Sequence, residues 1–75
     1  MPQTITHKGK LVRISPRNPR RLEESRDGGR AWLLVTERPF AFLDITDCGN
    51  EILARTSAGL YASTNGGRAW TLRRL

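Results

Sequence analysis

The sequence predicts a small all-β protein that consists of two consecutive antiparallel β-meanders. An eight-residue motif that begins at Ser25 recurs at Ser63, so the chain contains an internal repeat with an offset of 38 residues. Short apolar and β-branched runs alternate with clusters of Gly, Asn and Asp, a pattern typical of strands joined by tight turns. With 75 residues, the chain is a single small domain.

The second copy, about residues 42–75, has the clearer strand pattern. Residues 47–50, 57–59 and 65–67 are Gly-containing turn clusters, and the segments between them are short and apolar or alternating. We therefore predict strands over residues 40–46, 51–56, 60–63 and 68–72.

The first copy, about residues 4–37, is less regular. A turn at residues 7–10 separates strands at 4–6 and 11–14, and Pro16 and Pro19 make a stiff connection after them. Residues 21–25 and 31–36 are strands if the repeat register holds. Asn18 and Pro19 alternatively favour a short helix over residues 20–25 that ends by Gly28. Pro39 marks the link between the two copies.

The two copies align without a gap when residues 4–37 are placed over residues 42–75. This register gives ten identities in 34 positions. Besides the shared Gly-Gly-Arg-Ala-Trp, they include Ile14/Ile52, Arg17/Arg55, Leu22/Leu60 and Leu34/Leu72, and Ile5/Leu43 is a conservative match. The repeat therefore extends beyond the motif itself.

The motif combines residues that stabilise a hairpin turn. A side-chain oxygen at Asp27 or Asn65 can accept hydrogen bonds from inward-pointing backbone N–H groups, and the glycines allow positive φ. Trp32 and Trp70 can fold under their turns. The structural residues we assign to the motif are Ser25, Asp27, Gly29, Trp32, Ser63, Asn65, Gly67 and Trp70.

The pattern Ser-x-Asp-x-Gly-x-x-Trp resembles the Asp-box, or BNR repeat, of sialidases, sortilin-like receptors and photosystem II assembly factors. The resemblance implies two blade-like units of a β-propeller and a structural rather than catalytic role for the motif. Asn65 replaces the acid in the second copy, and Ala31 and Ala69 stand where that family usually has Thr.

Two blades cannot close a propeller, which typically has about four to eight. Three arrangements are open: two to four chains share one propeller, the two meanders pack face to face, or the chain is a fragment or degenerate descendant. Open sheet edges favour the first two, and a homo-oligomer is one of the expected partners.

The chain is basic, with a net charge of +6 and 11 arginines among its 13 cations. This charge favours an acidic partner, either a protein or a nucleic acid. We expect no membrane span, because no apolar stretch is long enough. The candidate binding residues are Lys8, Lys10, Arg13, Arg17, Arg20, Arg21, Tyr61, Arg73 and Arg74.

The sequence does not favour an enzyme. His7 is predicted to be an exposed turn residue, and Cys48 a small turn or half-buried residue. Asp44, Asp47 and Glu51 are close in sequence but lack the spacing of a Ca²⁺ loop. We expect no metal, no cofactor and no catalytic residue.

The sequence thus predicts a small, non-catalytic binding or scaffold module that contacts a protein or another macromolecule. The alternative is a nucleic-acid-binding protein that acts through an arginine-rich surface. The absence of a signal-like apolar run favours a cytoplasmic location.

Overall fold

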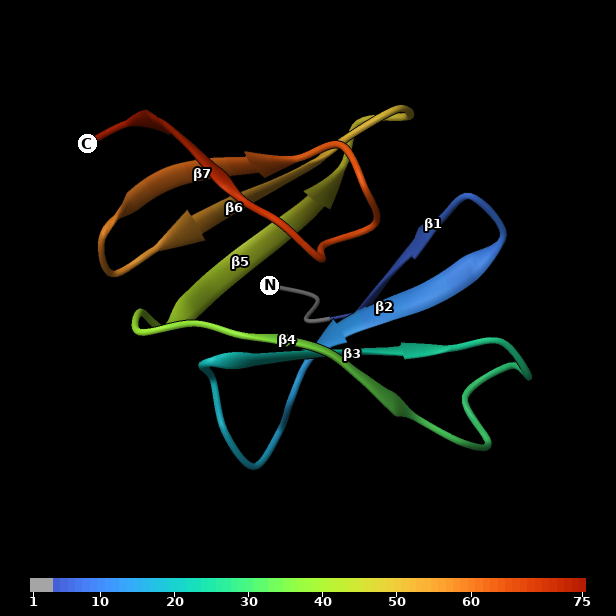
Figure 1. The fold of residues 1–75 in the computed structure, drawn as a ribbon. Coiled ribbons are helices and arrows are strands. Elements are labelled where there is room, and N and C mark those ends of the chain that lie inside the picture. Colours follow the sequence, from blue (N-terminus) through green and yellow to red (C-terminus); the bar gives the residue numbers. More distant parts are fainter. Residues whose placement is uncertain (1–3) are drawn as a thin grey trace.

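The computed structural model describes residues 4–75 and shows two four-stranded antiparallel sheets, which confirms the predicted all-β class and the two meanders (Figure 1). In each sheet, the strands follow one another in chain order. The strands of repeat 1 are β1 (Thr4–His7), β2 (Lys10–Ile14), β3 (Arg21–Ser25) and β4 (Leu33–Glu37). Those of repeat 2 are β5 (Phe42–Asp47), β6 (Ile52–Thr56), β7 (Gly59–Ser63) and β8 (Thr71–Arg74).

The segment after Pro19 is strand β3, so the strand interpretation is right and the helix alternative is wrong. Leu22 pairs with Ile14 of β2 and, on the other side, with Thr36 of β4. A central strand satisfies its backbone groups from two neighbours, and the alternation places Leu22 and Glu24 on the buried face. Long-range pairing therefore decides the conformation of this segment.

The last strand of each repeat begins later than predicted. β4 begins at Leu33 rather than at residue 31, and β8 begins at Thr71 rather than at residue 68. The residues in between belong to the preceding turn, because Asp27 accepts a hydrogen bond from the Ala31 N–H. The Ala31 N–H is therefore bonded within the turn and does not pair with a neighbouring strand.

The ungapped repeat register is correct only for the second half of each repeat. Ser25 pairs with Leu11, whereas Ser63 pairs with Ile52, so β2 and β6 correspond with an offset of 41 rather than 38. Counted between equivalent paired residues, the segment from Ile14 to Leu22 is three residues longer than the segment from Arg55 to Leu60. Ile52 is therefore the structural equivalent of Leu11, and its identity with Ile14 is not structural.

Both repeats carry the same irregularity between their last two strands. The register shifts between Leu22 and Glu23 in repeat 1 and between Leu60 and Tyr61 in repeat 2. The residues skipped by these pairings, Val35 in β4 and Arg73 in β8, are again 38 residues apart. A β-bulge at the same place shows that the two sheets are built to one plan.

The hydrophobic core lies between the two sheets. β5 contacts both β1 and β2, so the first strands of the two repeats lie side by side (Figure 1). Repeat 1 contributes Val12, Ile14 and Leu22, each at most 2% exposed. From repeat 2 and the linker come Phe40, Phe42, Ile45, Ile52 and Ala54.

Aromatic side chains fill one part of this core. Phe40 stacks on Tyr61 with ring centroids 4.5 Å apart and meets Phe42 edge-on at 5.3 Å. Phe42 in turn contacts Trp70, with centroids 5.4 Å apart. The linker residue Phe40 is therefore packed on the second sheet and belongs to the core that both repeats share.

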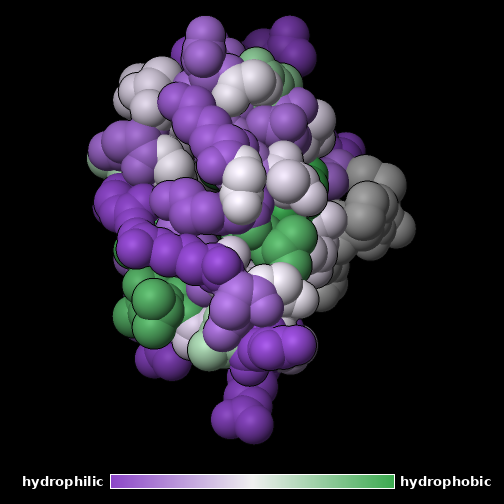
Figure 2. All heavy atoms as spheres, turned by 90° about the vertical axis from the view of Figure 1, so that its right-hand side faces the viewer, coloured by the Kyte–Doolittle hydropathy of each residue, from purple (hydrophilic) through white to green (hydrophobic). Residues whose placement is uncertain are grey.

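One side of the molecule is largely polar. The face seen in Figure 2 is mostly hydrophilic, and its hydrophobic areas are small and separate. The part of the chain that the structure describes contains no helix with the length and apolarity needed to cross a membrane.

Candidate functional site

The first repeated turn, residues 25–32, is held together by two side chains. Ser25 Oγ accepts from the Gly29 N–H at 2.8 Å and donates to Asp27 Oδ1 at 2.8 Å. The same carboxylate oxygen accepts from the N–H groups of Arg30 and Ala31. These bonds, the one from Ala31 first, lower the pKa of Asp27 below its usual value. The carboxylate is thus used to close the turn.

The second repeated turn, residues 63–70, reproduces this geometry with an amide. Ser63 Oγ accepts from the Gly67 N–H at 2.9 Å and donates to Asn65 Oδ1 at 2.9 Å. Asn65 Oδ1 also accepts from the Ala69 N–H at 2.9 Å. The Trp70 indole N–H donates to the Gly67 carbonyl at 2.7 Å, which folds the ring under the turn. Replacement of the acid by Asn65 therefore keeps the turn intact.

The second turn packs against repeat 1. A methyl group added to Gly67 would lie 3.4 Å from Leu22 Cδ1 and 3.6 Å from Val35 Cγ1. The Arg38 guanidinium donates to the Arg68 carbonyl at 2.9 Å. Arg68 makes a further contact with Glu24. This turn is therefore part of the interface between the two sheets.

Glu24 is a buried carboxylate surrounded by three cations, although it is only 3% exposed. Lys10 Nζ, Arg26 Nη2 and Arg68 Nη2 lie 3.2–3.4 Å from its oxygens. Burial raises the pKa of Glu24, but Lys10 and Arg68 lower it by more, so the carboxyl stays below its usual pKa. Lys10 is thus part of an ion-pair cluster that joins the repeats.

His7 is not the exposed turn residue that the sequence predicts. It ends β1, is 2% exposed, and its Nδ1 lies 2.7 Å from Asp47 Oδ1. Alternation along β1 points this side chain toward repeat 2, and the polar ring is accommodated because Asp47 Oδ1 accepts a hydrogen bond from its Nδ1–H. Cys48 is exposed in the following turn.

The predicted basic residues do not form one patch. Lys8 lies in the turn before β2 and Arg17 in the loop after it, so they are separated by the length of a five-residue strand, which is roughly 17 Å. Arg73 and Arg74 lie on β8 of the other sheet. The charge of this chain is therefore spread around the molecule.

Half of these cations are paired with carboxylates. Besides Lys10, Arg13 pairs with Glu23 at 2.8 Å, Arg21 with Glu37 at 2.9 Å, and Arg73 with Glu51 at 2.7 Å. Within residues 4–75, the candidates that make no ion pair are Lys8, Arg17, Arg20 and Arg74. Tyr61 is half-buried against Phe40, which leaves little of its ring for a surface contact.

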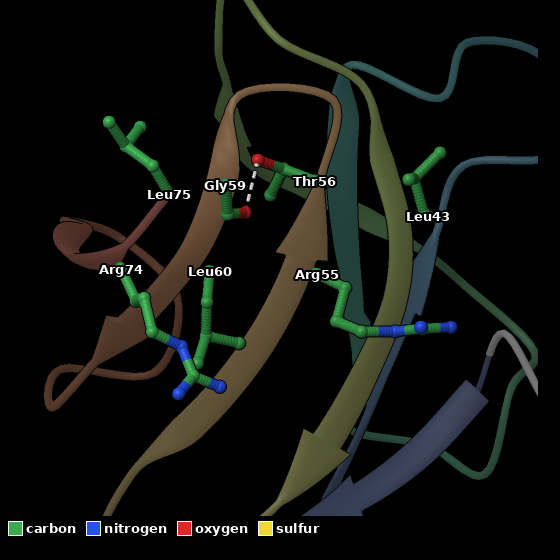
Figure 3. A pocket seen from close by; sticks show the side chains of 7 residues that line it. All are labelled: Leu43, Arg55, Thr56, Gly59, Leu60, Arg74 and Leu75. Carbon is green, nitrogen blue, oxygen red and sulfur yellow. Dashed lines mark hydrogen bonds between the residues drawn. The ribbon is translucent and has the colours of Figure 1, made fainter.

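The outer face of repeat 2 carries an open pocket of about 340 Å³ (Figure 3). Leu60 and Arg74, which are paired on β7 and β8, project from the sheet together, and Arg55 extends from β6. Leu43 and Leu75 are 58% and 94% exposed there. We name the surface formed by Leu43, Arg55, Leu60, Arg74 and Leu75 the repeat-2 face.

Sequence reasoning identified only Arg74 of the repeat-2 face. From the sequence, Leu43 appeared only as a conservative match to Ile5, and Leu60 only as an identity with Leu22. The repeat itself is the signal that could have found this face. When two equivalent sheets pack on each other, each covers one face of the other, so the apolar residues on the second face of each sheet stay uncovered.

The outer face of repeat 1 is the second uncovered sheet surface. The Arg13 guanidinium lies 4.0 Å from the centroid of the Trp32 ring and also pairs with Glu23. Leu34, whose strand partner is Glu23, is 61% exposed. We name the surface formed by Thr4, Leu11, Arg13, Trp32 and Leu34 the repeat-1 face.

The three acidic residues that are close in sequence, Asp44, Asp47 and Glu51, each contact a basic side chain. Asp44 pairs with Arg55 at 3.3 Å, Asp47 with His7, and Glu51 with Arg73. Among residues 4–75, no group of three His, Cys, Asp or Glu side chains is placed to hold a metal ion.

In a comparison with known proteins, no family model, no curated protein and no solved structure matches the chain.

Proposed function

We propose that this chain is a non-catalytic binding module, and that it holds a protein partner on the repeat-2 face. The observation that carries this proposal is the exposure of Leu43 and Leu75 beside an open pocket on the outer side of the second sheet. Exposed apolar side chains next to a concave surface mark interaction sites. Arg55 and Arg74 at the rim suit carbonyl or carboxylate groups of the partner.

The repeated turns support a structural use of the Asp-box-like motif. Their hydroxyl, carboxylate and amide groups are engaged in closing each turn. The resemblance to Asp-box repeats implies the same role. A nucleic-acid role rests on net charge alone, and it is weakened because the candidate cations are scattered and half of them are paired with carboxylates.

A photo-crosslinking experiment tests the proposal. Benzoylphenylalanine placed at position 43 should form a saturable protein cross-link in the cells that produce this chain. The same probe at Asn50, in the exposed turn after β5, is the matched control and should not. Arg74→Glu should weaken the cross-link from position 43.

The absence of a protein cross-link from position 43, or equal cross-linking from position 50, contradicts the proposal. Cross-linking to nucleic acid alone would instead favour the alternative function.

A further inference from the structure

We infer that the partner on the repeat-2 face is a second copy of this chain, which packs against it through its repeat-1 face. This inference rests on the proposed function and names its partner. Inside each chain, one face of repeat 1 packs against one face of repeat 2. Because the two sheets are equivalent, the repeat-2 face and the repeat-1 face are uncovered counterparts of these two packed faces.

The repeat-2 face is the structural equivalent of the covered face of repeat 1. The register relates β3 to β7 by 38 residues and β2 to β6 by 41 residues. In repeat 1 this face contributes Val12, Ile14 and Leu22 to the core. Their equivalents in repeat 2 are Leu53, Arg55 and Leu60. In repeat 1 this face is covered by repeat 2. In repeat 2 the equivalent face is not covered by repeat 1.

The repeat-1 face is, in the same way, the equivalent of the covered face of repeat 2. The covered residues Ile45, Ile52, Ala54 and Trp70 correspond to Thr4, Leu11, Arg13 and Trp32. Arg13 replaces the small Ala54, but its guanidinium lies over the Trp32 ring, 4.0 Å from the centroid, and its charge is paired with Glu23. The surface therefore remains suited to close packing.

The repeated turns complete the match. Inside the chain, Gly67 lies against Leu22 of repeat 1. Gly29 has nearly the same backbone, with φ of 97° against 95° for Gly67, and it is half-exposed. In a head-to-tail contact, Gly29 of one copy lies over Leu60 of the next, because Leu60 is the equivalent of Leu22.

The interchain contact lacks one feature of the internal one. Arg68 reaches Glu24 inside the chain, but the equivalents are Arg30 and Ala62, so no carboxylate faces Arg30 at this position. Loss of this charge-assisted hydrogen bond makes the contact weaker than the internal interface. We expect association to depend on concentration.

The two faces differ from each other, so the contact is head to tail. Each added copy presents a new free face until the assembly closes into a ring. Rings of about four to eight such sheets are typical, which corresponds to about two to four copies. The expected mass is therefore a small fixed multiple of 8.5 kDa.

Complementary face variants provide the test. Thr4→Arg blocks the repeat-1 face and Leu43→Arg blocks the repeat-2 face, and both positions are exposed, so folding is retained. Asn50→Arg adds the same charge outside both faces and serves as the control. Masses are measured by light scattering, and folding is checked by circular dichroism.

We expect wild type and Asn50→Arg to assemble, and each face variant alone to remain at 8.5 kDa. An equimolar mixture of Thr4→Arg and Leu43→Arg should form a heterodimer, because one intact pair of faces remains. A monomeric wild type at high concentration, or a mixture that stays monomeric, overturns the inference.

The same variants separate this inference from the proposed function. Cross-linking from position 43 to a different protein, in a chain that is monomeric, overturns self-association and leaves the binding function standing. The absence of cross-linking to any protein overturns both.

Discussion

His7 Nδ1 lies 2.7 Å from Asp47 Oδ1, so the last residue of β1 is tied to the last residue of β5 across the junction of the two sheets. The two residues are 40 positions apart in sequence. An ionised carboxylate can only accept, so the imidazole donates through Nδ1–H. This side-chain contact links β1 to β5, which belong to different sheets and are not paired with each other.

The first prediction concerns acid stability. The hydrogen bond from His7 lowers the pKa of Asp47 in the folded protein, and the Gly49 N–H adds to this effect, while desolvation opposes it. A carboxyl with a lowered folded pKa contributes stability above its unfolded pKa, near 3.8, and loses it as the pH falls through the folded pKa. We expect Asp47→Asn to flatten the decline in unfolding free energy below about pH 5.

Urea unfolding at a series of pH values measures this effect. His7→Ala should flatten the same part of the profile, because it removes the group that lowers the pKa of Asp47. A profile of Asp47→Asn that runs parallel to that of wild type down to acid pH would contradict the prediction.

The second prediction concerns the serine of each repeated turn. Ser25 and Ser63 are each 1% exposed, and each accepts from a glycine N–H four residues later. Removal of the hydroxyl leaves that N–H unsatisfied, which costs about 1–3 kcal/mol. Chemical denaturation of Ser63→Ala should show this loss, whereas Thr64→Ala, at the exposed neighbour, should stay within about 0.5 kcal/mol of wild type.

The third prediction uses the two turns as matched partners. Gly29 and Gly67 both have strongly positive φ, so alanine strains the backbone equally at both. Only at Gly67 does the new methyl group also meet Leu22 of the other repeat, at 3.4 Å. Gly67→Ala should therefore destabilise by roughly 1 kcal/mol more than Gly29→Ala. Both should be measured in the Thr4→Arg background, so that assembly does not contribute; equal losses would contradict this reading of the interface.

The fourth prediction concerns Glu24. Its buried carboxylate neutralises Lys10, Arg26 and Arg68, which come from both repeats. Glu24→Gln leaves these cations facing one another, and we expect a loss of about 1–3 kcal/mol. Glu23→Gln removes the partner of Arg13. Because Glu23 is more exposed than Glu24, this substitution should cost less than about 1 kcal/mol. If the two substitutions have equal effects in thermal unfolding, the cluster is not the stabilising link that we describe.

The local architecture followed from the sequence because tight turns have strong local requirements. Glycine at positive φ and an acceptor two residues after a serine define each repeated turn, and both turns form where the motif predicts them. The alternation of residues 52–56 also determined which residues of β6 face the core, since the side chains of a strand point to opposite faces in turn.

Other features depended on pairing between distant segments. Only the neighbouring strands decided that residues 21–25 form a strand rather than a helix. Only the strand pairing revealed the shift in register, because the segment from Ile14 to Leu22 is three residues longer than its equivalent from Arg55 to Leu60. The prediction that His7 is exposed was wrong for the same reason, because its burial requires Asp47, forty residues away.

By itself, the sequence determined the all-β class, the two repeats and the turns that end β3 and β7, because these depend on interactions within a few residues. The tertiary structure alone decided which face of each sheet is covered. The two sheets are nearly equivalent, so each could bury either face, and only their packing leaves Leu11 of one and Leu60 of the other outside the shared core.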